Sequence, residues 1–255
     1  MMEFADASPA VQVDPAEYHR LLGYPRGHVV IGRALELAEA SRDWYSRHGR
    51  PWIYARQTES LRAANGSVLL DGVPFAARRL HTALQQAEAH SAFLVAAAAG
   101  PEAEDHAHLL WEEGKPDEYF FLEIFASAVV EHLFTSAGAR LCAWAEGQGM
   151  AVLPHASPGY SQWDIAEQPA LLRLIQSGPS ALPGKLESLT SGALLPKKSQ
   201  LGVFGITHHA VPPLANLVPC HNCSFAPCQF RRAPNRRAGC QPAAGWQPAS
   251  SPSIP

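Results

Sequence analysis

Apolar residues recur at helical spacing in several segments of the chain. A first helix is predicted from Pro15, because Asp14 suits the N-cap position, proline is favoured in the first turn and Gly23 can end the helix. A second helix is predicted over residues 30–48, and the longest over residues 117–147. Shorter helices are predicted over residues 80–90, 102–113 and 163–177.

Short apolar runs bounded by turn residues predict the strands. Residues 92–99 are the most apolar run, and Gly100 and Pro101 end it, which is typical of a buried strand. Further strands are predicted over residues 51–55, 67–70, 152–153, 186–191 and 200–206. Because helices and strands mix without strict alternation, the pattern favours an α+β domain with a largely antiparallel sheet.

The ends of the chain differ in composition from its middle. Residues 1–12 are predicted to be a flexible leader, residues 13–232 one module with a cysteine segment at 218–232, and residues 233–255 a disordered tail rich in Pro, Ala, Ser and Gly. With 255 residues, 47% of them hydrophobic, the chain can bury a sizeable core.

Charge and hydropathy exclude some classes of partner. A formal net charge of −3 gives no reason to expect a nucleic-acid surface. The start of the chain lacks the basic and apolar regions of a secretory signal, and the run at residues 92–99 is far shorter than the roughly 20 residues of a membrane span. We therefore expect a cytoplasmic protein with no membrane partner.

Glu131 is the first candidate functional residue, because small side chains share its face of the long predicted helix. Small neighbours allow a backbone or a ligand to approach, and a carboxylate there calls for a cationic partner. The alternative is a half-exposed glutamate that pairs with Arg140 or with a lysine elsewhere. The small neighbours are Ser127, Ala128, Thr135 and Gly138.

Residues 157–160 predict a tight turn, since Pro158 fixes its own φ and Gly159 permits a positive one. Such a turn can present several backbone N–H groups on one side. Tyr160 and Trp163 add aromatic faces for stacking or for a cation. The alternative is an ordinary turn between a strand and a helix, with both aromatic side chains in the core.

Four of the five cysteines lie close together near the C-terminus. Four thiolates suit zinc or an iron–sulfur cluster, and His221 could replace one of them. The alternative is a reduced cluster that helps to fix the C-terminus. A basic pair, Arg231-Arg232, follows the third cysteine and could meet an acidic partner or a phosphate. The four cysteines are Cys220, Cys223, Cys228 and Cys240.

The motifs of self-sufficient enzymes are missing from the sequence. It has no Gly-x-Gly-x-x-Gly, no phosphate-binding Gly-Lys-Ser/Thr loop, no Gly-x-Ser-x-Gly and no His-Glu-x-x-His. Nothing therefore marks the chain as a hydrolase, a kinase or a dehydrogenase.

The order of several segments resembles the activation domain of cobalamin-dependent methionine synthase, in particular its stand-alone versions. The resemblance covers roughly residues 14–232, and the order is more specific than any one segment. The segments are 18–24, 93–100, 126–131, 157–160 with Trp163 and Gln168, 195–199 (Leu-Pro-Lys-Lys-Ser), and the cysteine segment that ends in Arg231-Arg232.

The resemblance implies a curved antiparallel sheet flanked by helices that binds S-adenosylmethionine. In that family an electron donor such as flavodoxin reduces the oxidised cobalt of cobalamin, and S-adenosylmethionine then remethylates it. The resemblance implies a methionine synthase or another corrinoid protein as partner, Glu131 beside the positive groups of the ligand, and residues of the turn against it. The residues expected against the ligand, in the turn and next to it, are His155, Ala156, Ser157, Pro158, Gly159, Tyr160 and Trp163.

The sequence differs from the family's usual residues at two places. His155 stands where the family usually has Arg, which holds a ligand carboxylate bidentately, so affinity is weaker or Lys197 or Lys198 serves instead. Ala98-Ala99 replaces a pair that often bears a hydroxyl.

Two other hypotheses for the function compete with S-adenosylmethionine-dependent reactivation. One is a cysteine-based metal or redox adaptor without S-adenosylmethionine chemistry, and the other is a family member that kept the fold but lost the ligand.

Overall fold

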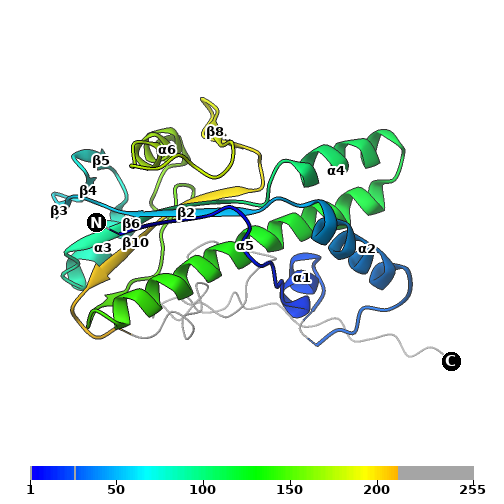
Figure 1. Cartoon of the computed structure of the whole chain (residues 1–255), viewed down its shortest axis with the longest axis horizontal. Coiled ribbons are helices and arrows are strands. Elements are labelled where there is room, and N and C mark those ends of the chain that lie inside the picture. Colours follow the sequence, from blue (N-terminus) through cyan, green and yellow to red (C-terminus); the bar gives the residue numbers. More distant parts are fainter. Residues whose placement is uncertain (1, 26, 212–255) are drawn as a thin grey trace, which may run out of the picture. The chain divides into compact units, whose positions relative to one another are not determined.

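A five-stranded antiparallel sheet forms the centre of the protein. The computed structural model describes residues 2–25 and 27–211, and all structural statements concern these residues. Each neighbouring pair in the sheet is antiparallel, so the predicted α+β fold with an antiparallel sheet is confirmed (Figure 1). In spatial order the strands are β1 (Glu3–Asp6), β2 (Trp52–Gln57), β6 (Ser91–Ala98), β10 (Ser199–Thr207) and β7 (Ala151–Val152).

Two small sheets and six α-helices complete the described part. The small sheets are β3 (Leu61–Ala64), β4 (Ser67–Leu70) and β5 (Val73–Phe75), and the pair β8 (Glu187–Ser188) and β9 (Leu194–Leu195). The helices are α1 (Pro15–Leu21), α2 (Gly32–His48), α3 (Arg78–Gln86), α4 (Glu102–Glu112), α5 (Pro116–Glu146) and α6 (Gln168–Gln176), with a 3-10 turn η1 (Ile165–Glu167) before α6.

Both faces of the central sheet are covered, which explains why β6 is apolar along its whole length. Phe93 and Val95 pack into the core on the side of α1, α2 and α5. Ala92 and Leu94 point the other way, into the core shared with α6 and the β3-β4-β5 sheet. Figure 1 shows the sheet edge-on between these two layers.

Helix α5 is the long helix that runs along one face of the sheet (Figure 1). Among the described residues it is long and apolar enough to cross a membrane, with a mean hydropathy of 1.4 in its most apolar window. More than half of that window is buried against the rest of the protein. Its apolar composition is therefore accounted for by its place in the core.

The start of α1 confirms the predicted cap. The Asp14 side chain accepts a hydrogen bond from the Ala16 N–H at 2.9 Å, and Pro15 stands at the first helical position. The buried Tyr18 hydroxyl then donates to the Phe121 carbonyl at 2.8 Å, which fixes α1 against α5.

The flexible leader predicted for residues 1–12 is wrong for residues 3–6, because they form the edge strand β1. Glu3 pairs with Arg56 and Asp6 with Ile53 in the antiparallel register. The guanidinium of Arg140 from α5 lies 5.6 Å from the centre of the Phe4 ring and forms an ion pair with Asp6. Pairing with β2 and side-chain contacts with α5 order this short segment.

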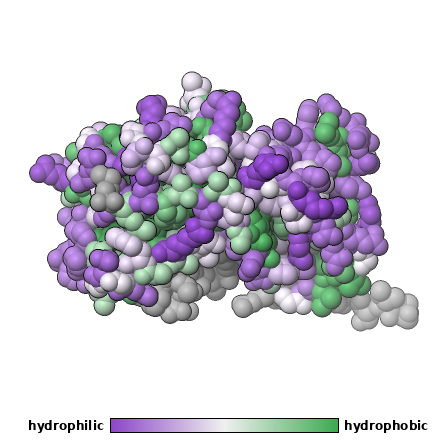
Figure 2. Space-filling view, in the orientation of Figure 1, coloured by the Kyte–Doolittle hydropathy of each residue, from purple (hydrophilic) through white to green (hydrophobic). Residues whose placement is uncertain are grey.

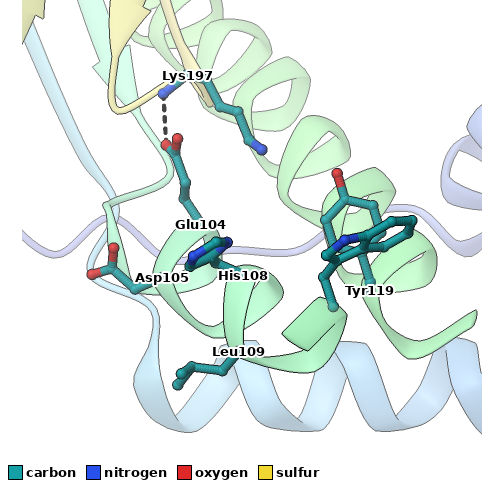
Figure 3. Close-up of a pocket in the computed structure, with 7 residues that line it drawn as sticks. Glu104, Asp105, His108, Leu109, Tyr119 and Lys197 are labelled. Atoms are coloured by element: carbon teal, nitrogen blue, oxygen red, sulfur yellow. Dashed lines mark hydrogen bonds between the residues drawn. The ribbon is translucent and has the colours of Figure 1, made fainter. Parts of the chain in front are cut away.

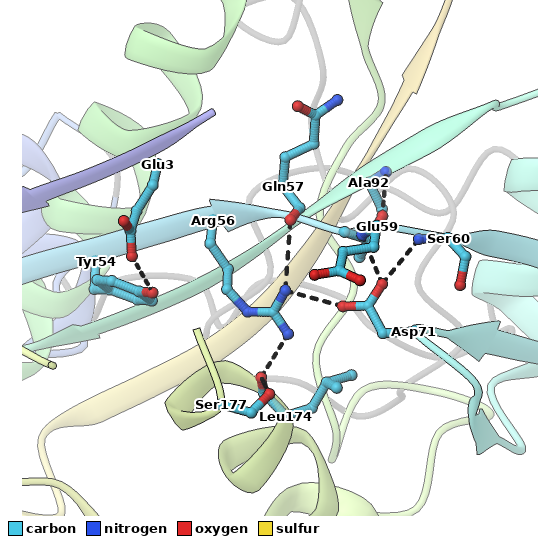
Figure 4. A network of polar contacts seen from close by, with 11 residues as sticks. Glu3, Tyr54, Arg56, Gln57, Glu59, Ser60, Asp71, Ala92, Leu174 and Ser177 are labelled. Carbon is cyan, nitrogen blue, oxygen red and sulfur yellow. Dashed lines mark hydrogen bonds and ion pairs between the residues drawn. The ribbon is translucent and has the colours of Figure 1, made fainter. Parts of the chain in front are cut away.

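A buried ion pair ties three elements together on the α6 side of the sheet (Figure 4). Arg56, only 3% exposed, donates to Asp71 at 2.9 Å and to the Leu174 carbonyl of α6 at 2.6 Å. Asp71 also accepts the backbone N–H groups of Glu59 and Ser60 at 2.7 and 2.9 Å. One carboxylate therefore neutralises a buried cation and closes the turn before β3.

Candidate functional site

A cavity of about 280 Å³ opens between α5 and the turn at residues 157–160. The structure thus brings Glu131 next to Ser157, Pro158 and Tyr160, although these residues come from separate elements. The remaining lining residues come from the segment after the turn and from the start of β10: Ile165, Gln168, Ser199, Gln200 and Leu201.

Two glycines make this arrangement possible. A Cβ on Gly202 of β10 would lie 2.8 Å from the Phe134 ring of α5 and 3.2 Å from the Ser157 hydroxyl. Because that position carries no side chain, both the helix and the turn can approach the strand closely. Gly159 has φ +89°, which an L-residue with a side chain rarely adopts, and so allows the turn to close.

The turn uses its backbone N–H groups internally. The Gly159 N–H donates to the Trp163 carbonyl at 2.9 Å, and the Tyr160 N–H donates to the Ser157 carbonyl at 3.0 Å. The Ala156 N–H donates to the Val203 carbonyl of β10 at 3.0 Å. The prediction that the turn presents N–H groups to a ligand is therefore wrong for Gly159 and Tyr160.

Side chains close the turn onto β10 in a polar cluster. The amide of Gln200 donates to the Tyr160 hydroxyl at 3.0 Å and to the Ser157 hydroxyl at 3.3 Å. The Nε2 atom of His155 lies 3.1 Å from the Tyr160 hydroxyl, and its ring also contacts Phe204 and Phe134. His155 thus holds Tyr160 at the cavity rather than lining the cavity itself.

Burial lowers the pKa of His155 to about 4. A histidine whose pKa falls on folding binds fewer protons in the folded than in the unfolded state between pH 6.5 and 4. We therefore expect the contribution of His155 to the free energy of unfolding to be constant above about pH 6.5 and to fall by about 2–3 kcal/mol as the pH drops towards 4. Urea unfolding of the wild type and His155→Gln across this range tests it, because the variant should lose that part of the pH dependence.

Trp163 is placed in the core and does not line the cavity. Its side chain is 4% exposed and packs edge-on against Phe75, with ring centres 5.9 Å apart. Tyr160, by contrast, is 42% exposed and lines the cavity. Of the two aromatic residues near the turn, only Tyr160 offers a ring to a molecule in the cavity.

The lysines of the Leu-Pro-Lys-Lys-Ser segment bind a different carboxylate of α5. Lys197 and Lys198 form ion pairs with Glu123 at 2.9 and 3.1 Å, and Lys198 also donates to the Ser127 hydroxyl at 2.8 Å. Neither lysine lines the cavity that contains Glu131. The expectation that one of them replaces the family's arginine at this cavity therefore gains no support from the geometry.

Comparison with known proteins identifies the fold of the chain. No family model matches the sequence, and no curated protein matches it. A solved structure, described as the crystal structure of the MetH reactivation domain bound to AdoHcy, matches with a TM-score of 0.58 and 13% sequence identity over 81% of each chain. The chain has the fold of a MetH reactivation domain. The match confirms the fold expected from the order of the sequence segments.

Several residues that line the cavity were not predicted from the sequence. Gln168 and Ser199 stood within the segments that carried the resemblance, but Ile165, Gln200 and Leu201 had no signal of their own. The Ser199 Oγ atom is buried without a hydrogen-bond partner. The register of β10 beside the turn puts these residues at the cavity.

A second, larger cavity of about 680 Å³ has Lys197 in its lining, two residues before Ser199 of the first cavity. Figure 3 shows residues of α4 on one side of it and Tyr119 of α5 on the other, with Lys197 donating its backbone N–H to Glu104. Nothing in the sequence pattern pointed to this cavity. It is lined by Glu104, Asp105, His108, Leu109, Trp111, Tyr119 and Lys197.

The predicted metal ligands Cys220, Cys223, Cys228 and Cys240 lie outside the described residues. Within residues 2–25 and 27–211, no group of three or more His, Cys, Asp or Glu side chains could hold a metal ion. The cysteine of this part, Cys142, belongs to α5 and is partly buried. Zinc or an iron–sulfur cluster at the C-terminal cysteines stays a prediction.

Proposed function

We propose that this chain binds S-adenosylmethionine in the cavity between α5 and the 157–160 turn. In trans, it would then support reductive remethylation of the cobalamin in methionine synthase or a related corrinoid methyltransferase. The observation that carries the proposal is the meeting of Glu131 with Ser157, Pro158 and Tyr160 in one cavity, in a chain with the MetH reactivation-domain fold.

The chemistry of the cavity suits such a ligand. S-adenosylmethionine carries a sulfonium and an ammonium group, and the Glu131 carboxylate can attract either one. The amides of Gln168 and Gln200 and the orphaned Ser199 hydroxyl supply neutral hydrogen-bonding groups. A volume of about 280 Å³ is at the lower end for ligand sites, so part of the ligand would lie outside it, against the exposed Tyr160 ring.

The proposed reaction needs no catalytic side chain. The corrinoid partner, reduced by one electron from a donor such as flavodoxin, would supply the nucleophile for the methyl group. S-adenosylmethionine would give up that methyl group through cleavage of its carbon–sulfur bond and leave as S-adenosylhomocysteine with the sulfur electron pair. Because the cobalt is the nucleophile and the sulfonium is a good leaving group, the protein needs only to hold the two in line.

The low pKa of His155 bears on affinity. Burial keeps this imidazole neutral at pH 7 and its Nε2 atom contacts the Tyr160 hydroxyl, so His155 brings no positive charge to the ligand's carboxylate. We therefore expect weaker binding than an arginine at this position would give.

A remethylation assay tests the proposed role. A methionine synthase fragment without its own reactivation domain would carry cob(II)alamin and receive Ti(III) citrate and methyl-labelled S-adenosylmethionine. We expect label and the methylcobalamin spectrum to appear at least about tenfold faster with the chain than without it, and Glu131→Gln to remove most of the gain. Equal rates with and without the chain would refute the role, and the exposed Glu146→Gln is the matched control.

A further inference from the structure

The strongest concentration of charge lies in the hairpin formed by α4 and the first turn of α5. Residues 101–120 contain seven Asp or Glu and one Lys, a net charge of −6, whereas the whole chain carries −3. A field of one sign over a small region steers partners of the opposite sign and repels those of the same sign.

Part of this charge is neutralised away from the large cavity. Glu102 lies 3.8 Å from Arg50, and Glu118 lies 2.6 Å from Arg33. Lys115 pairs with Glu113. Within the cavity itself, Glu104 accepts the backbone N–H of Lys197 and also attracts its ammonium, which is paired with Glu123. The cavity therefore keeps a negative lining from Glu104 and Asp105.

Large apolar side chains are exposed on the same hairpin. Leu109 is 52% exposed, Trp111 60% and Phe120 45%, three of the nine large apolar side chains exposed among the described residues. Leu109 and Trp111 line the 680 Å³ cavity, and the Trp111 ring contacts the Tyr119 ring edge-on at 5.3 Å. In Figure 2 the surface over α4 is mostly hydrophilic with an apolar patch within it. Grouped exposed apolar residues with a polar rim mark interaction sites.

We infer that this cavity and its acidic rim form a docking surface for a basic, amphipathic segment of a partner protein, with Trp111 as the anchor. Lys or Arg side chains of such a segment meet Glu104 and Asp105 and can lie over the Trp111 ring, while its apolar residues cover Leu109. The inference does not depend on the ligand proposed for the Glu131 cavity.

Other occupants fit these observations less well. A second copy of the chain would bring the same net −6 hairpin against itself if it used this face symmetrically, and an anionic membrane would be repelled in the same way. A small cation would leave the exposed apolar side chains of Leu109 and Trp111, which line the cavity, uncovered. A protein segment satisfies both the charge and the apolar area.

The docking surface and the proposed ligand site share one segment of the chain. Lys197 lines the large cavity, and Ser199 and Gln200, two and three residues later, line the cavity with Glu131. A partner bound at the hairpin is therefore brought to the chain segment that also borders the proposed ligand site.

The test is fluorescence anisotropy of labelled peptides of about 16 residues added to the full chain. The first peptide places Lys and Leu on opposite faces of a helix, the second has Lys and Ser, and the third has Ser and Leu. We expect micromolar binding of the Lys/Leu peptide alone, weakened at least about tenfold by Trp111→Ala and by Asp105→Lys, and weakened by salt. The exposed Leu189→Ala and Glu146→Lys are the matched controls and should change it less than about twofold.

Several results would overturn the inference. Equal binding of the Lys/Ser peptide would mean charge attraction alone, and equal binding of the Ser/Leu peptide would mean apolar contact alone. Unchanged binding in Trp111→Ala and Asp105→Lys, or self-association of the chain through this face in sedimentation, would place the peptide elsewhere or assign the face to a second copy. All substituted side chains are exposed, and thermal melting checks that each variant folds.

Discussion

Replacing Asp71 with alanine is expected to lower the free energy of unfolding by about 3–5 kcal/mol. The substitution leaves the Arg56 guanidinium buried without its counter-ion, since the side chain of Arg56 is 4% exposed and that of Asp71 14%. It also removes the acceptor of the Glu59 and Ser60 N–H groups (Figure 4). Urea unfolding followed by circular dichroism measures the loss.

The exposed Asp43→Ala is the control for this change and should stay within about 0.5 kcal/mol of the wild type. A double variant, Arg56→Met with Asp71→Ala, removes both charges and should recover part of the stability, because the uncompensated cation is gone. A loss below about 1 kcal/mol in Asp71→Ala would show that water or another group satisfies Arg56.

Replacing Phe204 with alanine is expected to cost a similar amount, about 3–5 kcal/mol. The Phe204 side chain is 2% exposed, and its ring centre lies 6.3 Å from that of Phe134 and 5.2 Å from that of His155. It therefore joins β10 both to α5, which carries Glu131, and to the segment before the turn. Removing the ring leaves a void between β10, α5 and the segment before the turn.

Phe120→Ala is the matched control, because Phe120 is 45% exposed and the same atoms are removed. Its cost should be below about 1 kcal/mol. If the two variants unfolded at the same denaturant concentration, Phe204 would not have the packing role that the structure assigns to it.

Much of the fold could be predicted because local signals agree with the tertiary structure. Asp14 and Pro15 begin α1 through a cap that needs no distant partner. The run at residues 92–99 predicts a buried strand because both faces of β6 are covered. Strand β1 was missed because a four-residue edge strand owes its order to pairing with β2, which no local pattern reveals.

The candidate site was predictable only in part. The meeting of Glu131 with the 157–160 turn was expected from the order of the segments, and the structure places them at one cavity. The internal use of the N–H groups of Gly159 and Tyr160 was not foreseen, because a turn sequence does not state which carbonyls its donors meet. The same holds for Lys197 and Lys198, whose partner Glu123 is more than seventy residues away.

Titration calorimetry of the full chain with S-adenosylmethionine tests the central claim most directly. We expect saturable heat for the wild type, at least about tenfold weaker affinity for Glu131→Gln, and unchanged affinity for the exposed Glu146→Gln. No heat at millimolar ligand with the folded wild type, or equal affinity in Glu131→Gln, would contradict the assignment of this cavity.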